Sequence, residues 1–142
     1  MDSIIEVYIK DLIGGQADGF GLFIVNGKTL KCFIPEWLHD GWYDREKGEK
    51  NLSLIGSKIE ASISLLNLRE IEKNENNEKG IEYAPSIGVN YHIVKGKVLK
   101  KMGEVKYLID CGVPIGFGPT RRKLENGDYI IATGRLDIKL IK

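Results

Sequence analysis

The chain has 142 residues, of which 42% are hydrophobic and 29% charged, and its formal net charge is +1. This composition is typical of a folded globular protein and excludes a wholly disordered chain. No window reaches the apolar length of about 18 residues that a membrane helix needs, and the first six residues lack the basic and then apolar layout of a signal peptide, so we expect a cytoplasmic protein without membrane contact.

The charge is divided unevenly along the chain. Residues 1–71 carry eight basic and eleven acidic side chains, a net −3, whereas residues 72–142 carry thirteen and nine, a net +4. From residue 91 onward the excess is larger, with eleven basic against five acidic residues, a net +6. The C-terminal half is therefore the part expected to meet a polyanion.

The cysteines and histidines do not form a ligand pattern. Cys32 and Cys111 stand singly in apolar runs, no CxxC pair occurs, and His39 and His92 are far apart in the sequence. We therefore predict no metal site, no cofactor and no disulfide, and interpret the cysteines as buried free thiols.

In chain order, the first predicted strand covers residues 5–12, where apolar and polar residues alternate before a Gly-Gly pair. A hairpin follows, with strands at 21–25 and 28–34. Asn26-Gly27 between these two runs favours a type I′ turn, because both central residues of that turn need positive φ. Pro35 and the acidic residue after it then predict a short helix over residues 35–40.

The insertion 36–51 contains both tryptophans of the chain and leaves two interpretations open. Trp37, Trp42 and Tyr43 could form an exposed patch that docks on a protein partner, because such aromatic residues are typical interface anchors. They could instead close the open end of a barrel. We favour the plug for Trp37, which is close to a predicted strand, and leave Trp42 open.

The remaining elements are again strands. One is predicted over residues 58–68, and the polar residues 70–90 after it read as a linker or loop. Further strands are expected at 91–99, 104–112, 113–115 and 129–140. The fold class predicted is therefore all-β.

Two passages of the chain repeat one another, residues 56–65 and residues 127–136. Glycine, isoleucine, alanine and a β-branched or hydroxyl residue recur at the same offsets in both. Internal repeats of this kind indicate related modules. We predict one module over residues 1–69 and a second, basic one over residues 91–142, or else a single barrel elaborated by duplication.

The second module also resembles a known family. Val94-x-Gly96-Lys97-Val98, residues 107–112 and the passage 124–136, with Gly-Asp at 127–128 and Gly-Arg at 134–135, resemble the OB-fold, a small five-stranded barrel that binds oligonucleotides and oligosaccharides. The resemblance implies two OB-like barrel modules in tandem, with Gly134 as the connection or bend between strands four and five. The first module lacks the Gly-Arg step and has Ile63-Ser64 there.

The basic residues of the second module define a candidate nucleic-acid site. Three consecutive cations and a nearby phenylalanine stand in the loop that flanks the ligand groove of OB-folds, and strand lysines could continue the track. The competing interpretation is a solvated lysine face with a basic turn. The candidate residues are Lys95, Lys97, Tyr107, Phe117, Arg121, Arg122, Lys123 and Arg135.

No enzyme is expected. His39 beside Asp40 has no matched nucleophile motif, and the glycines of residues 112–118 lack the Gly-Lys-Ser/Thr ending of a phosphate loop. The predicted function is non-catalytic binding of single-stranded DNA or RNA through the second module. The alternative is a subunit or inhibitor that docks on a protein through the insertion or a strand edge.

Overall fold

The computed structural model describes residues 3–39 and 41–141, and their regular structure is almost entirely β. The all-β prediction is confirmed. A single short 3-10 helix, η1, spans Leu52–Leu54. The strands are β1 (Ile5–Gly14), β2 (Gly19–Val25), β3 (Lys28–Ile34), β4 (Tyr43–Asp44), β5 (Glu49–Lys50), β6 (Lys58–Lys73), β7 (Gly80–Tyr83), β8 (Tyr91–Lys101), β9 (Tyr107–Asp110), β10 (Pro114–Phe117) and β11 (Tyr129–Leu140).

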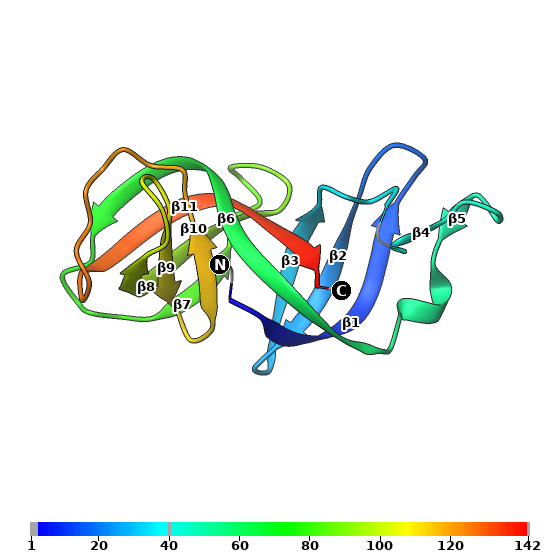
Figure 1. The fold of residues 1–142 in the computed structure, drawn as a ribbon, viewed down its shortest axis with the longest axis horizontal. Helices are drawn as coiled ribbons and strands as arrows, with labels where there is room; N and C mark the ends of the chain where they lie inside the picture. Colours follow the sequence, from blue (N-terminus) through cyan, green and yellow to red (C-terminus); the bar gives the residue numbers. More distant parts are fainter. Residues whose placement is uncertain (1–2, 40, 142) are drawn as a thin grey trace.

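Nine of these strands form one sheet that closes on itself twice. The first ring runs β1-β2-β3-β11-β6 and back to β1, and the second runs β8-β9-β10-β6-β11 and back to β8. In Figure 1 the rings lie side by side, and the long strands β6 and β11 pass through both. Each ring is a small barrel, although the first is closed between β3 and β11 by a single residue pair, Phe33↔Asp137.

The two repeats of the sequence correspond to these shared strands. Leu65 of β6 lies opposite Leu136 of β11, and each is the tenth residue of its repeat. Pairing of equivalent residues is what an approximate twofold axis through that pair produces. β6 accordingly leaves the first ring for the second, and β11 leaves the second ring for the first.

Gly134 lies where β11 passes between the rings. The β6–β11 register shifts between Thr133 and Arg135, which is a bulge in the ladder. A Cβ at Gly134 would be 2.6 Å from the carbonyl oxygen of Leu66, so only glycine fits without displacement. The expected bend is present, but the two strands predicted on either side of it are one continuous strand.

The predicted hairpin is confirmed in detail. β2 and β3 pair from Gly19↔Ile34 to Val25↔Lys28. Asn26 and Gly27 have φ of 49° and 77°, the positive values that a type I′ turn needs. The side-chain amide of Asn26 also donates to the carbonyl of Gly112 at 3.0 Å, which links the first ring to the second.

Two predictions about chain segments are wrong. Residues 35–39 form turns and a bend rather than a short helix, and residue 40, the end of that prediction, lies outside the described residues. The polar linker expected over residues 70–90 is partly strand, because β6 continues to Lys73 and β7 occupies Gly80–Tyr83. β6 continues because β11 supplies a pairing partner as far as Lys73↔Ile130.

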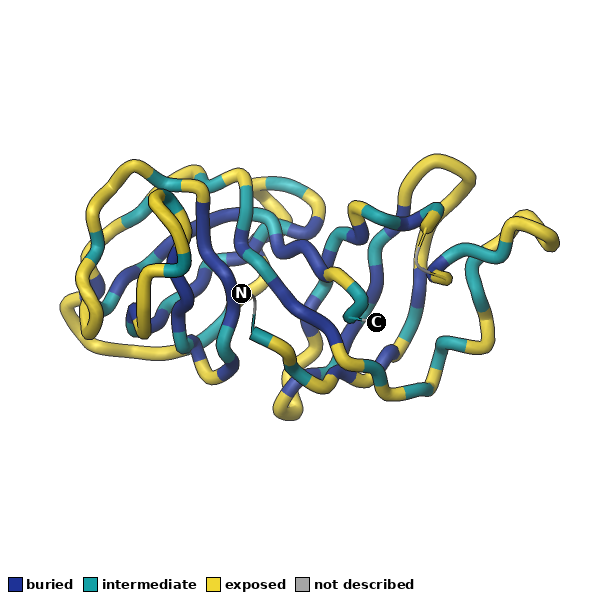
Figure 2. The backbone as a smooth tube through the Cα atoms, in the orientation of Figure 1, coloured by how far each residue is buried: buried dark blue, intermediate teal, exposed yellow. Residues whose placement is uncertain are grey.

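The buried side chains of both rings form one hydrophobic cluster. In Figure 2 the buried positions follow the strands, while the connections at the far ends of the rings are exposed. Since one cluster spans both rings, neither ring has a core of its own to stabilise it separately. The described residues include no helix with the length and apolarity required to cross a bilayer.

Candidate nucleic-acid interface

The loop between β10 and β11 is held in place by the strands beneath it. The amide of Thr120 donates to the Val105 carbonyl at 2.8 Å. The Tyr107 hydroxyl donates to the Arg122 carbonyl at 3.3 Å and accepts from the Leu124 amide at 3.1 Å. The backbone that carries the three consecutive cations is therefore fixed at several points, while Arg121, Arg122 and Lys123 themselves are exposed.

Arg122 separates two shallow hollows. One, of about 280 Å³, is lined by residues 68–71, 119, 120 and 122, including Arg69. The other, of about 230 Å³, is lined by residues 73, 122–124 and 128–130, including Lys73, Lys123 and Tyr129. The Arg122 guanidinium donates to the Ile71 carbonyl of β6, which holds it between the two. We call this region, the lining of both hollows with Arg121, the Arg122 surface.

The cations of the Arg122 surface are free of ion pairs with the carboxylates of residues 3–39 and 41–141. None of them has an acidic oxygen within 4 Å, although Glu70 and Asp128 line the hollows. The Asp128 carboxylate accepts the Glu125 amide at 2.8 Å, as a turn residue does. The free cations are Arg69, Lys73, Arg121, Arg122 and Lys123.

Two of the predicted cations are already paired. Lys95 contacts Glu78 at 3.2 Å, and Arg135 contacts Asp137 at 2.7 Å. Arg135 also lies at the ring junction, opposite Tyr91 in the β8–β11 ladder and with its guanidinium 4.4 Å from the centroid of Phe33. The expected single track that includes Arg135 is therefore not formed.

The predicted stacking residues are not available for bases. Tyr107 and Phe117 are each 2% exposed and belong to the core. They lie opposite one another in the β9–β10 ladder and face the inside of the second ring. Closeness to basic residues along the chain did not reveal which face of the strand each ring occupies.

Tyr129 is an aromatic neighbour that the sequence did not single out. It is half-buried, lines the hollow beside Lys123, and lies opposite Lys97 in the β8–β11 ladder. Tyr91 does not line the other hollow, but it lies beside Arg69, whose guanidinium is 5.5 Å from the centre of the tyrosine ring. The sequence signal that could have identified Tyr129 is its place directly after Gly127-Asp128, where it is the first residue of a strand and, in the alternation of that strand, occupies an outward-facing position.

The tryptophans of the insertion are in the core. Trp37 is 1% exposed and packs so closely on Gly19 that a Cβ there would lie 2.4 Å from the indole. Trp42 is fully buried, edge-on to Phe23 at 6.0 Å, and Tyr43 is half-buried beside Trp37. The burial of Trp37 agrees with a plug, and the exposed indole anchors of the alternative are absent from the described surface.

The two cysteines are not reactive centres. Burial raises the pKa of the Cys111 thiol to about 11 and raises that of Cys32 as well, so both remain protonated and poorly nucleophilic. Among the residues that the structure describes, no group of three or more His, Cys, Asp or Glu side chains could hold a metal ion. What the Arg122 surface offers is positive charge beside half-buried aromatic side chains.

Comparison with known proteins gives no relative: no family model, no curated protein and no solved structure matches the chain.

Proposed function

We propose that the protein is a non-catalytic, cytoplasmic binding protein that holds single-stranded nucleic acid on the Arg122 surface. The observation that carries this proposal is the set of five cations without acidic partners around the two hollows. Phosphates bind such cations by displacing only water and counterions, whereas an ion-paired lysine must first lose its carboxylate.

The aromatic rings beside the cations support a single-stranded ligand. Tyr129 lines one hollow and Tyr91 lies beside Arg69 of the other, and base stacking on such rings is tolerant of sequence. The five-stranded rings also support a relation to the OB-fold, whose members bind nucleic acids at the barrel surface. Two buried free cysteines agree with a reducing compartment.

The test is fluorescence anisotropy with labelled oligothymidine and oligouridine across a range of salt concentrations. Arg121 and Lys123 are replaced together by glutamate, since neither side chain makes a hydrogen bond within the described residues. If both contact phosphates, the affinity falls by at least about tenfold, and the slope of log K against log salt becomes shallower by about 1.4, at about 0.7 per phosphate.

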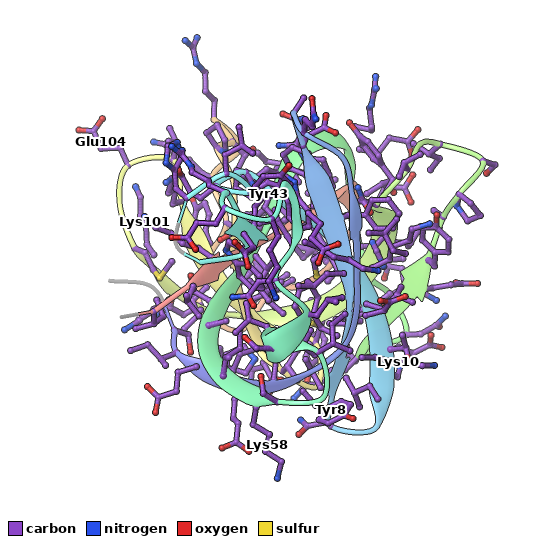
Figure 3. All side chains as sticks on the ribbon, turned by 90° about the vertical axis from the view of Figure 1, so that its right-hand side faces the viewer. Tyr8, Lys10, Tyr43, Lys58, Lys101 and Glu104 are labelled. Carbon is purple, nitrogen blue, oxygen red and sulfur yellow. The ribbon has the colours of Figure 1, made fainter. Side chains whose placement is uncertain are left out.

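Lys10→Glu is the matched control. Lys10 is exposed on β1, and in Figure 3 it projects on the side of the molecule away from Lys101 of the second ring. This variant should bind the oligonucleotides as the wild type does. Equal affinity of the doubly substituted protein and the control, or binding that does not respond to salt, would refute the assignment.

Because Trp37 and Trp42 are buried, they do not support the alternative function of docking on a protein through the insertion. Docking through a strand edge has a separate basis, because β7 is the last strand of its sheet.

A further inference from the structure

A second surface lies between the rings, where two strand edges face each other. β7 pairs only with β8 among the described residues, and β3 has β2 on one side and a single residue pair with β11 on the other. A cavity of about 160 Å³ separates the start of β3 from β7 and the β9–β10 turn. In Figure 1 this turn and the β2–β3 turn lie on the same, lower side of the molecule.

The outward backbone groups of β7 are those of Ile81 and Tyr83. The Ala84 amide donates to the Tyr91 carbonyl at 2.8 Å, which sets the alternation of the ladder. In an antiparallel pair, alternate residues direct their N–H and C=O groups away from the partner. The Lys28 ammonium confirms this direction, because it crosses from β3 and lies 3.5 Å from the Ile81 carbonyl.

The cavity between these edges is apolar. Its walls include Val25, Leu30, Ile81 and Val113. A dry apolar cavity of about 150 Å³ accommodates a benzene molecule, so this one has room for a branched or aromatic side chain. An extended backbone bound to β7 would direct alternate side chains to the same side, one of them toward this cavity.

The lysines at the rim of this cavity differ in whether a carboxylate is paired with them. Lys79 is occupied by Asp110 at 2.8 Å, and Lys95 by Glu78 at 3.2 Å. Lys28 has no carboxylate within 4 Å among the residues described, and its ammonium donates to the Ile81 carbonyl, a neutral acceptor. A carboxylate brought to this rim would therefore meet an uncompensated ammonium.

We propose that the groove between β3 and β7 binds an extended peptide segment of a protein partner by strand addition to β7. One apolar side chain of the peptide enters the cavity, and an acidic side chain two residues away pairs with Lys28. This binding site is separate from the Arg122 surface and does not depend on the nucleic-acid proposal.

The experiment uses the full chain and two labelled, acetylated polythreonine peptides. Each carries one leucine and one glutamate two positions apart, in opposite orders because the direction of the added strand is open. Saturable binding of one order is expected, with amide resonance shifts at Ile81 and Tyr83. Replacing the peptide leucine by glycine should lower the affinity by at least about tenfold.

A charge exchange tests the rim. Lys28→Glu should lower the affinity for the glutamate peptide by at least about tenfold. It should raise the affinity for the matching peptide in which lysine replaces glutamate. Lys10→Glu is again the matched control and should bind as the wild type does. Lys28 is exposed, and a thermal melt shows whether the variant remains folded.

Three results would overturn the peptide site. They are no saturable binding by either order in the wild type, equal affinity for the glycine analogue, and an unchanged affinity in folded Lys28→Glu. Competition by oligothymidine that is lost in Lys28→Glu would instead assign the groove to nucleic acid.

Discussion

The guanidinium of Arg135 donates two hydrogen bonds to the carboxylate of Asp137, from Nε to Oδ1 at 2.7 Å and from Nη2 to Oδ2 at 2.9 Å. Asp137 is 5% exposed, and burial raises its pKa although Arg135 opposes that rise. The Arg135 guanidinium also lies over the aromatic ring of Phe33, 4.4 Å from its centroid. Arg135 thus compensates a buried charge at the junction of the rings.

Arg135→Ala should destabilise the protein by about 2 to 3 kcal/mol at neutral pH, because it leaves the Asp137 carboxylate buried without its partner. Loss of the cation raises the folded-state pKa of Asp137 further, so the deficit grows as pH rises above the ordinary aspartate value of about 3.9. Urea unfolding at acidic and neutral pH measures it. Lys139→Ala, an exposed change on the same strand, should have little effect.

The same substitution separates structure from binding. Since the Arg135 guanidinium is already occupied by the Asp137 carboxylate, folded Arg135→Ala should retain the oligonucleotide affinity of the wild type. A loss comparable to that of the Arg121 and Lys123 double variant would place Arg135 in the binding surface after all.

His92 should give stability a pH dependence on the acidic side of neutrality. The imidazole is 1% exposed, its Nδ1 lies 2.9 Å from the Asn90 carbonyl, and its Nε2 is buried without a hydrogen-bond partner among the described residues. Burial lowers the pKa of His92, so the unfolded chain takes up a proton at pH values where the folded protein does not. Stability should therefore fall as pH drops below about 6.5, until the folded-state pKa is passed.

Urea unfolding at several pH values measures this slope, and His92→Gln should lack it. An NMR titration of the His92 ring gives a direct comparison. A midpoint at or above the ordinary histidine value would contradict the burial argument.

Gly134→Ala tests the crossing of β11 between the rings. Its Cβ would lie 2.6 Å from a backbone oxygen of β6, so the shared ladder must shift, at a cost of about 2 kcal/mol. Gly103→Ala is the matched control, because a Cβ there has no atom within 4 Å and should change stability by less than about 0.5 kcal/mol. Equal unfolding midpoints for the two variants would mean that the crossing tolerates a side chain.

The two tryptophans should respond differently to replacement by phenylalanine. The Trp37 indole donates to the Gly15 carbonyl at 2.8 Å, whereas the buried Trp42 indole N–H has no acceptor in the part of the chain that the structure describes. Both changes remove core volume, but only Trp37→Phe loses a hydrogen bond. We expect Trp37→Phe to be more destabilising than Trp42→Phe by about 1 kcal/mol. Urea denaturation of both variants measures the difference, and the reverse order would contradict it.

Local signals in the sequence predicted much of the fold. Asn26-Gly27 specified its turn because positive φ at two successive residues suits few other pairs. The repeat at residues 56–65 and 127–136 marked the two strands that prove to be equivalent. Such features depend on neighbouring residues alone, so one chain suffices to recognise them.

Long-range pairing could not be predicted in the same way. Residues 70–73 read as linker because only Ile71 among them is apolar, and their strand conformation depends on β11, some 60 residues later. For the candidate site, the three adjacent cations were evident from the sequence. Whether a given aromatic side chain faces the inside of its barrel was not evident. Phe117, which was expected at the site, is therefore in the core, and Tyr129, for which no role was predicted, lines a hollow.

The sharing of β6 and β11 also constrains how the chain can fold during synthesis. The first ring needs residues 135–140 and the second needs residues 129–135, so a nascent chain that ends before β11 can close neither barrel. The N-terminal hairpin would emerge from the ribosome with its neighbouring strand still unmade. Protection of that open edge, by speed of translation or by a chaperone, then becomes a requirement for making the protein in the cell.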